Sequence, residues 1–164
     1  MRLLFSIVML SMITLTSSIH AQSNESDPAL LIGRSNVKWL QNNKQFAWFN
    51  SGYDNYNTNA SAIEQLQKIT PDISFIVFAG TWSDATQTLL PQFYKALDAA
   101  KINRGRVMLY FLDRDKKSPQ GFEGQFSINN VPTFIVMKNG EEVGRIVESV
   151  SSSIEGDLVD ILGR

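Results

Sequence analysis

Two continuous apolar runs divide the chain and predict an α/β protein. Residues 73–80 and 106–113 are rich in β-branched and aromatic side chains, a composition typical of strands buried on both faces of a sheet. Between them, residues 84–102 carry apolar side chains at helical spacing. The three segments together predict a βαβ unit. Pro91 falls inside the helix, where the loss of one backbone hydrogen bond predicts a kink.

The segments before this unit predict one further helix and one strand. Residues 60–69 have apolar positions three residues apart, with Asn59 in a capping position and Thr70-Pro71 as a stop signal. The second half of residues 37–50 is apolar and aromatic, and we interpret it as a strand. The Asn-rich and Gly-containing residues that follow are interpreted as a loop.

The segments after the unit predict a β-hairpin and a last helix. Residues 133–137 and 142–147 have strand-like patterns, and a Lys-Asn-Gly turn joins them. Residues 154–162 have apolar side chains along one side of a helix. The charged residues 113–117 are interpreted as a solvated loop and not as a cation site, because positive and negative side chains alternate there.

The N-terminal segment has the pattern of a secretory leader. Residues 1–21 have a positive start, an apolar centre, a Ser/Thr-rich trailer and the small Ala21 at the cleavage position. The alternative is an uncleaved membrane anchor, although the apolar run is shorter than the ~20 residues that span a bilayer. We therefore expect a signal peptide over 1–21, a polar spacer over 22–36 and one domain over 37–164. The expected location is the periplasm, with the extracellular space as the alternative.

Charge excludes one class of partner. The chain has 15 Lys and Arg against 16 Asp and Glu, and loss of Arg2 with the leader leaves 14 against 16, a net charge of −2. Nucleic-acid binding requires a concentrated basic face. We expect no nucleic-acid partner, and no membrane span once the leader is removed. The oligomeric state stays open.

The chain lacks the side chains on which most enzyme chemistry depends. It contains no cysteine, and its single histidine, His20, lies in the predicted leader. Disulfides, thiolate catalysis, Ser-His-Asp triads and the common zinc sites therefore cannot be assembled from the mature chain. We expect no catalytic residue, no cofactor and no metal site.

Several stretches resemble a known family. The run "FIVFAGTW", the helix containing Pro91 and the later "NNVPTFIVMKNGEEVGRIVES" are similar to the thioredoxin-like superfamily, and particularly to its exported bacterial members. The similarity covers roughly residues 46–162. It implies an α/β thioredoxin-like fold, in which a central mixed β-sheet of four to five strands is flanked by helices on both faces.

In that family the active-site motif is Trp-Cys-x-x-Cys at the start of a helix. The resemblance places Trp82 on the family's tryptophan and Ser83 and Thr86 on its two cysteines. The active-site-equivalent turn therefore consists of Ser83, Asp84, Ala85 and Thr86. A helix N-terminus can lower a cysteine's pKa from about 8.5 into the range of roughly 3.5–7.5. A serine hydroxyl does not ionise there, and oxygen cannot form the mixed disulfide of thiol exchange.

The resemblance also implies a peptide-binding groove. It places Pro132 on the family's cis-proline, in a loop that lies against the active-site turn and pairs with an extended substrate. Val77 falls where many thioredoxins carry a buried acid. The groove implied for this chain consists of Trp82, Ser83, Thr86, Val131, Pro132 and Thr133.

Ordinary structural roles are the favoured explanation of the polar turn residues, and the alternative is a polar contact from Ser83 and Asp84 to a bound peptide or anion. Ser83 and Asp84 suit a helix cap and first turn, which are worth about 1 kcal/mol. Thr86 is expected on the surface of the first turn. Trp82 either packs against the domain or contacts a partner, and the sequence does not decide between these.

The favoured function is a redox-inactive module that binds a polypeptide partner or serves as a scaffold. The alternative is a thiol-disulfide oxidoreductase, which holds only if this sequence is an altered form of a cysteine-bearing parent. A hydrolase that uses Ser83 has no visible base.

Overall fold

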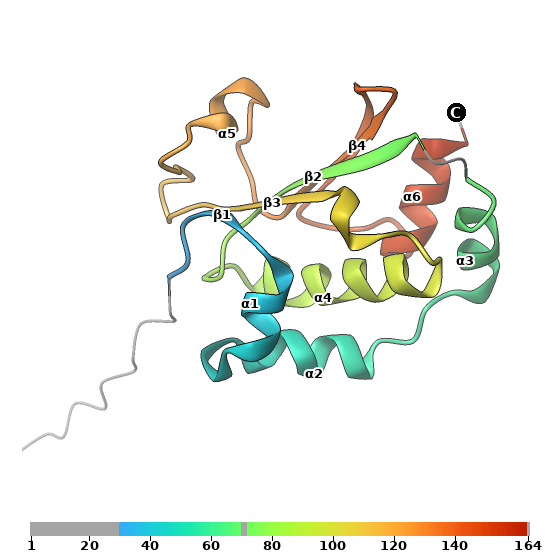
Figure 1. Ribbon diagram of the computed structural model, residues 1–164, viewed down its shortest axis with the longest axis horizontal. Helices are drawn as coiled ribbons and strands as arrows, with labels where there is room; N and C mark the ends of the chain where they lie inside the picture. The colour runs from blue at the N-terminus through green and yellow to red at the C-terminus, as the bar shows by residue number, and fades with distance from the viewer. Residues whose placement is uncertain (1–29, 70–71, 164) are drawn as a thin grey trace, which may run out of the picture.

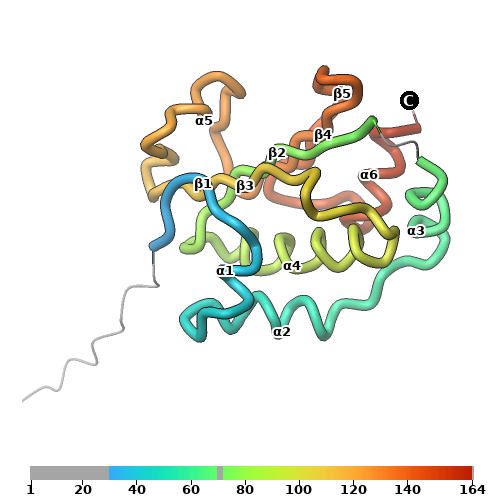
Figure 2. Tube along the Cα trace, viewed as in Figure 1, coloured from blue at the N-terminus to red at the C-terminus, as the bar shows by residue number. Residues whose placement is uncertain are grey.

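The computed structural model describes residues 30–69 and 72–163, which contain a five-stranded mixed sheet covered by helices (Figure 1). The strand order is β1-β3-β2-β4-β5. The strands are β1 (Gly33–Ser35), β2 (Ile73–Ala79), β3 (Val107–Phe111), β4 (Thr133–Lys138) and β5 (Glu141–Val147). Central β2 pairs in parallel with β3 and antiparallel with β4, and β4 and β5 form a hairpin at one edge (Figure 2).

The helices lie mostly on one face of this sheet. They are α1 (Val37–Asn42), η1 (Lys44–Phe46), α2 (Ala47–Asn55), α3 (Ala60–Leu66), α4 (Asp84–Ala99), η2 (Arg104–Arg106), α5 (Phe122–Gln125) and α6 (Ile154–Leu162). Long helix α4 lies between the sheet and α2 (Figure 1). Short α5 lies on the opposite face, where the segment between β3 and β4 covers the sheet (Figure 1).

Strand β2 is rich in apolar residues because both faces of the sheet are covered at this strand. Its residues Phe75, Val77 and Ala79 belong to the larger core on the α4 side. Alternate residues Ile76 and Phe78 belong to a smaller core on the α5 side. Successive side chains of a strand point to opposite faces, so a strand covered on both sides is apolar along most of its length, and Ser74 is the one polar residue of β2. The predicted central strand and the α/β thioredoxin-like fold class are confirmed.

One predicted element is wrong. The second half of residues 37–50 was expected as a strand, but it forms η1 and the start of α2, which continues to Asn55 through part of the expected loop. Phe46, Phe49 and Tyr53 recur at spacings of three and four residues, which places them on one side of a helix. Phe49 packs against Tyr94 of α4 with ring centroids 5.9 Å apart. This packing favours the helix over the strand propensity of the aromatic residues.

The boundaries of the other elements are close to expectation. Asn59 caps α3 by accepting from the Ala62 amide, α6 begins and ends as predicted, and Asn139 and Gly140 form the hairpin turn with positive φ angles of 54° and 84°. Strand β1 lies within the segment 22–36 that was expected as a spacer.

Two predictions concern residues that the structure does not describe. The expected leader over 1–21 and the Thr70-Pro71 stop lie outside the described residues. Among the residues that the structure does describe, no helix is both long and apolar enough to cross a membrane.

Candidate functional site

The turn between β2 and α4 is built by a serine cap. The Ser83 backbone is extended, with φ −93° and ψ 122°, and its hydroxyl oxygen accepts from the Thr86 amide at 3.3 Å. Asp84 follows in the first turn of the helix, where it is exposed and where the helix dipole favours an acidic side chain. The predicted cap is confirmed for Ser83, and Asp84 lies in the first helical turn as predicted.

Ser83 also joins the turn to the loop before β4. Its hydroxyl donates to the Val131 carbonyl oxygen at 3.1 Å. The Val131-Pro132 peptide bond is cis, as predicted. The structure therefore brings together two segments that are nearly fifty residues apart in the chain, as the resemblance implied. Both hydrogen-bonding functions of the serine hydroxyl are used within the fold.

Thr86 has a different place from the one expected. It was predicted on the surface of the first helical turn, but its side chain is fully buried. Its hydroxyl oxygen accepts from the Gly80 backbone amide at 3.2 Å, just after β2 ends. Because a buried amide must find an acceptor, Thr86 completes the end of the central strand and is not available as a surface contact.

Trp82 is both anchored and partly exposed. Its indole Nε1 donates to the Leu112 carbonyl oxygen at 3.1 Å, and its ring packs against the smaller core. A Cβ added to Gly80 would lie only 2.7 Å from the indole, so the ring needs glycine beneath it. The Arg114 guanidinium lies 5.9 Å from the ring centroid. The indole is thus held in one orientation with part of its surface available.

Among the described residues, the backbone amide of the buried Val131 has no hydrogen-bond partner. Val131 is only 3% exposed, and its carbonyl is bound by Ser83. Its amide N–H makes no hydrogen bond with any of the residues described. Next to it, the Pro132 carbonyl accepts from the Glu148 amide at 2.9 Å. Unpaired buried amides are rare in native proteins, so the Val131 N–H is the polar group of this site that most requires an explanation.

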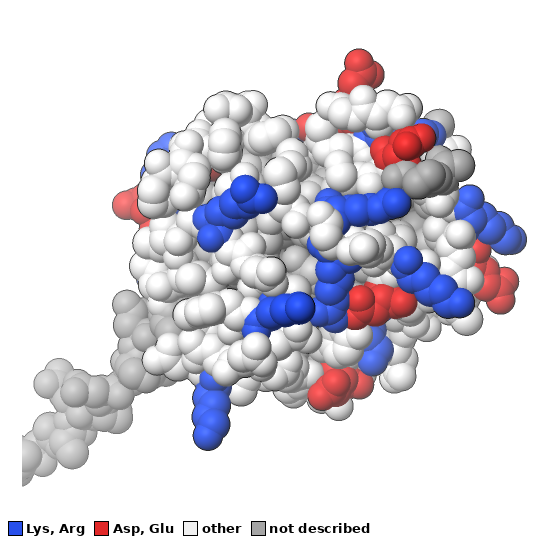
Figure 3. All heavy atoms as spheres, in the orientation of Figure 1, with Lys and Arg blue, Asp and Glu red and all other residues white. Residues whose placement is uncertain are grey.

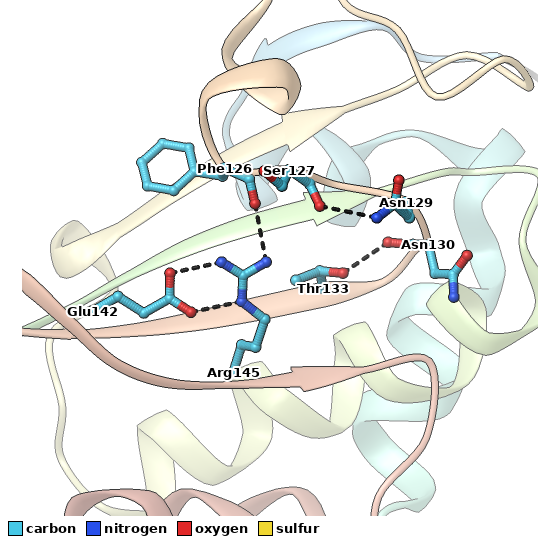
Figure 4. A network of polar contacts seen from close by, with 7 residues as sticks. All are labelled: Phe126, Ser127, Asn129, Asn130, Thr133, Glu142 and Arg145. Carbon is cyan, nitrogen blue, oxygen red and sulfur yellow. Dashed lines mark hydrogen bonds and ion pairs between the residues drawn. The ribbon is translucent and has the colours of Figure 1, made fainter.

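Polar contacts hold this loop against the hairpin (Figure 4). The Arg145 guanidinium makes two hydrogen bonds of 2.6 Å to the Glu142 carboxylate and a third of 3.0 Å to the Phe126 carbonyl. The buried Thr133 hydroxyl donates to the Asn130 carbonyl at 2.7 Å. The bidentate pair lies within β5 and orients the Arg145 guanidinium, whose third hydrogen bond joins the hairpin to the segment before Val131, while the Thr133 hydroxyl joins the residues on either side of the Val131-Pro132 peptide.

The site has no group that could activate a nucleophile. The two hydrogen-bond partners of the Ser83 hydroxyl are a backbone carbonyl and a backbone amide, and neither is a base. Val77, at the family's buried-acid position, lies in the apolar core. Within the described ranges, no group of three or more acidic or histidine side chains is arranged to hold a metal ion. Among the residues that the structure describes, the Ser83 hydroxyl therefore has no general base as a hydrogen-bond partner.

Two solved structures superpose on this chain with TM-scores above 0.5. A protein of unknown function from Pseudomonas aeruginosa superposes with a TM-score of 0.55 at 14% identity, over 80% of this chain and 91% of that one. An HIV epitope scaffold gives 0.54 at 15% identity, over 80% and 93%. Thioredoxin-2 of the malaria parasite gives 0.41 at 23% identity, over 58% and 85%. No protein-family model and no curated protein matches the sequence.

The fold and the turn together define the class of protein. The mixed sheet, the βαβ unit that ends in a capped turn, and the cis-proline just before β4 constitute a thioredoxin-like fold. The chain contains no cysteine, and Ser83 and Thr86 lie at the start of the helix that follows the central strand. This is a thioredoxin-fold protein that lacks the redox residues.

Sequence reasoning missed two features of the site. The Ser83–Val131 hydrogen bond and the unpaired Val131 amide both depend on how two distant segments meet, and no local pattern encodes them. The burial of Thr86 could have been found. It lies three residues before Leu89 and four before Leu90, so it occupies the apolar side of the helix.

Proposed function

We propose that this protein is an exported, redox-inactive module that holds an extended polypeptide against the Ser83 turn. The contact surface consists of Trp82, Ser83 and the Val131-Pro132 peptide. Thr86 and Thr133, which are buried, support this surface from beneath. The absence of cysteine from the chain removes thiol exchange as its own chemistry.

The Val131 amide is the observation that carries the proposal. Leaving a buried donor unpaired costs about 1–3 kcal/mol. An extended polypeptide has backbone carbonyls at regular intervals, and main-chain pairing is a common way in which such segments are bound. A carbonyl of the partner would satisfy the Val131 N–H, and the exposed part of the Trp82 indole would contact an adjacent apolar side chain.

Ser83 limits how this polypeptide pairs. Its hydroxyl already donates to the Val131 carbonyl, so only the amide side of Val131 is free. A partner that pairs with both groups must displace the serine hydroxyl. We therefore expect Ser83→Ala to bind an extended polypeptide about two- to fivefold more tightly, because the freed carbonyl can accept a second main-chain hydrogen bond.

The binding test uses an unfolded probe and two tryptophan variants. Fluorescence anisotropy measures binding of labelled, reduced and carboxymethylated α-lactalbumin, a permanently unfolded chain. We expect Trp82→Ala to weaken binding about tenfold or more, since buried aromatic contacts dominate such interfaces. Trp39→Ala is the matched control, because Trp39 is 46% exposed on α1 and is not part of the site. Equal losses in both variants, or no binding by the unaltered protein, would rule the groove out.

Export is a separate part of the proposal, supported only by the pattern of residues 1–21. Expression of the full chain in a Gram-negative host, followed by mass spectrometry of the periplasmic fraction, should recover a protein that begins at Gln22. An intact N-terminus in the membrane fraction would instead support the anchor.

The oxidoreductase alternative has its own test. Cysteine codons at positions 83 and 86 in the encoding DNA of the source would show that the sequence is an altered form and would restore that alternative.

A further inference from the structure

A second concavity lies away from the Ser83 turn. It has a volume of about 650 Å³ and lies between the junction of β1 with α1 and the segment formed by η2 and β3. That volume is within the range of small-molecule pockets. Two asparagine side chains cap the short helices whose first residues line the pocket. Asn36 accepts from the Lys38 amide at 2.9 Å, and Asn103 accepts from the Gly105 amide at 2.7 Å.

The lining of this pocket is cationic. Arg34, Lys38 and Arg104 line it, and no Asp or Glu does. The Arg104 charge is offset by the Asp98 carboxylate, which it binds through two nitrogens. Arg34 and Lys38 form no ion pair with any residue that the structure describes. Figure 3 shows Lys and Arg side chains gathered on this face. The pocket is therefore lined by two positive charges without an ion-pair partner among the described residues, although the net charge of the chain is −1.

A buried tyrosine in the pocket lacks a partner. Tyr94 is only 2% exposed, yet it lines the pocket from α4. Its hydroxyl makes no hydrogen bond with any described residue, and no fully buried side-chain oxygen among those residues lacks a partner, so the Tyr94 hydroxyl oxygen is accessible and free to donate. Burial raises the pKa of Tyr94 well above its ordinary value, so the hydroxyl remains a donor. The Arg104 guanidinium lies over its ring at 5.4 Å and fixes its position.

The pocket also has an apolar part. Val37, Val107 and Leu109 line it beside the Tyr94 ring. A ligand that fits must therefore carry negative charge at one end and apolar surface at the other. An inorganic anion would leave the apolar lining uncovered, and a neutral apolar molecule would leave the two cations unpaired.

We propose that this pocket binds a small organic carboxylate with an aromatic or aliphatic body. The carboxylate accepts from Arg34, whose planar guanidinium matches two carboxylate oxygens, and is attracted by Lys38. One carboxylate oxygen also accepts from the Tyr94 hydroxyl. The apolar body rests on Val107 and Leu109. This site is independent of the polypeptide groove, and none of its lining residues belongs to that groove.

The test is a titration of ¹⁵N-labelled protein with sodium benzoate, followed through the amides of Val37 and Gly105, which line the pocket. We expect saturable shifts at these amides. The double variant Arg34→Gln, Lys38→Gln should weaken benzoate binding about tenfold or more, because it removes both uncompensated charges. The control Lys68→Gln, Lys138→Gln changes the net charge equally at exposed lysines that do not line the pocket, and should leave the affinity within about twofold.

Tyr94→Phe separates a ligand role from a structural one. We expect it to weaken benzoate binding about threefold or more while leaving the midpoint of thermal unfolding unchanged, because the hydroxyl has no partner in the protein to lose.

Two further probes complete the test. Benzyl alcohol and inorganic phosphate should each bind at least about tenfold more weakly than benzoate. Benzyl alcohol binding as tightly would overturn the role of charge, and phosphate binding as tightly would overturn the role of the apolar lining. The absence of saturable benzoate shifts would overturn the site.

Discussion

Two hydroxyl groups lie in the turn between β2 and α4, at the positions where the resemblance places the family's cysteines, and both serve the fold. The Ser83 hydroxyl caps α4 and donates to the Val131 carbonyl. The Thr86 hydroxyl accepts from the Gly80 amide at the end of β2. Cysteine is a weak hydrogen-bonding residue, so these oxygens make contacts that thiols would make less well. The two hydroxyl oxygens therefore contribute structural hydrogen bonds at this turn.

The Thr86 contact predicts a measurable loss of stability. Thr86→Val keeps the shape of the side chain but leaves the buried Gly80 amide without an acceptor, which should lower the free energy of unfolding by about 1–3 kcal/mol. Thr88→Val, at an exposed position on the same helix, should change it by less than about 0.5 kcal/mol. Urea denaturation of both variants measures the difference. Equal values would show that the Gly80 amide does not depend on Thr86.

Residue-level prediction from sequence succeeded where the interaction is local. Ser83 and Asn59 were identified as caps because a cap contacts amides two or three residues away. The unpaired Val131 amide could not be found in this way, because it depends on which distant groups reach the loop.

At the scale of elements, the sequence pattern predicted a strand where the structure has η1 and the start of α2, and the contact between α2 and α4 accounts for the difference. Aromatic residues favour strands in general, yet Phe49 and Tyr53 are placed on a helix by their packing against α4. Gly52 permits a close approach, since a Cβ there would lie 2.7 Å from the Pro91 ring. The predicted Pro91 position in α4 is confirmed, and its ring is part of this contact.

A charged cluster joins α2, α4 and η2 and predicts a pH dependence. The Asp98 carboxylate accepts from the Tyr53 hydroxyl at 2.6 Å and from Arg104. Burial alone would raise the pKa of Asp98, but hydrogen bonds from Arg104 and Tyr53 outweigh it and lower the pKa below its ordinary value. A lowered carboxylate pKa stabilises the fold above the unfolded-state pKa of about 4, and this contribution is lost as the pH falls through the folded-state pKa.

We therefore expect Asp98→Asn to lower the free energy of unfolding by about 1 kcal/mol at pH 7, a modest value because the pair is partly exposed. The difference from the unaltered protein should shrink as the pH falls below about 4. The control is Asp54→Asn, an exposed residue of α2 without a hydrogen-bond partner among those described. Urea denaturation across this pH range measures both, and a deficit that stays constant with pH would contradict the assignment.

At the scale of the whole molecule, the sequence predicted the βαβ unit, the hairpin and the final helix, because each has a strong periodic pattern. It did not predict β1, which has three residues and forms only by pairing with β3 across a long stretch of chain. It also did not predict how unevenly the helices cover the sheet, with α5 and its flanking segment on one face and the others opposite. That distribution depends on tertiary packing rather than on any local pattern.

The unpaired Val131 amide, the anchored Trp82 and the absence of cysteine support one proposal, in which the Ser83 turn serves as a polypeptide contact. The most direct measurement is the chemical shift of the Val131 amide proton during titration with reduced, carboxymethylated α-lactalbumin. The account predicts a saturable downfield shift, because the N–H gains a carbonyl acceptor, together with changes at the Trp82 indole and none at Trp39. A Val131 amide that does not shift when the probe is bound would contradict it.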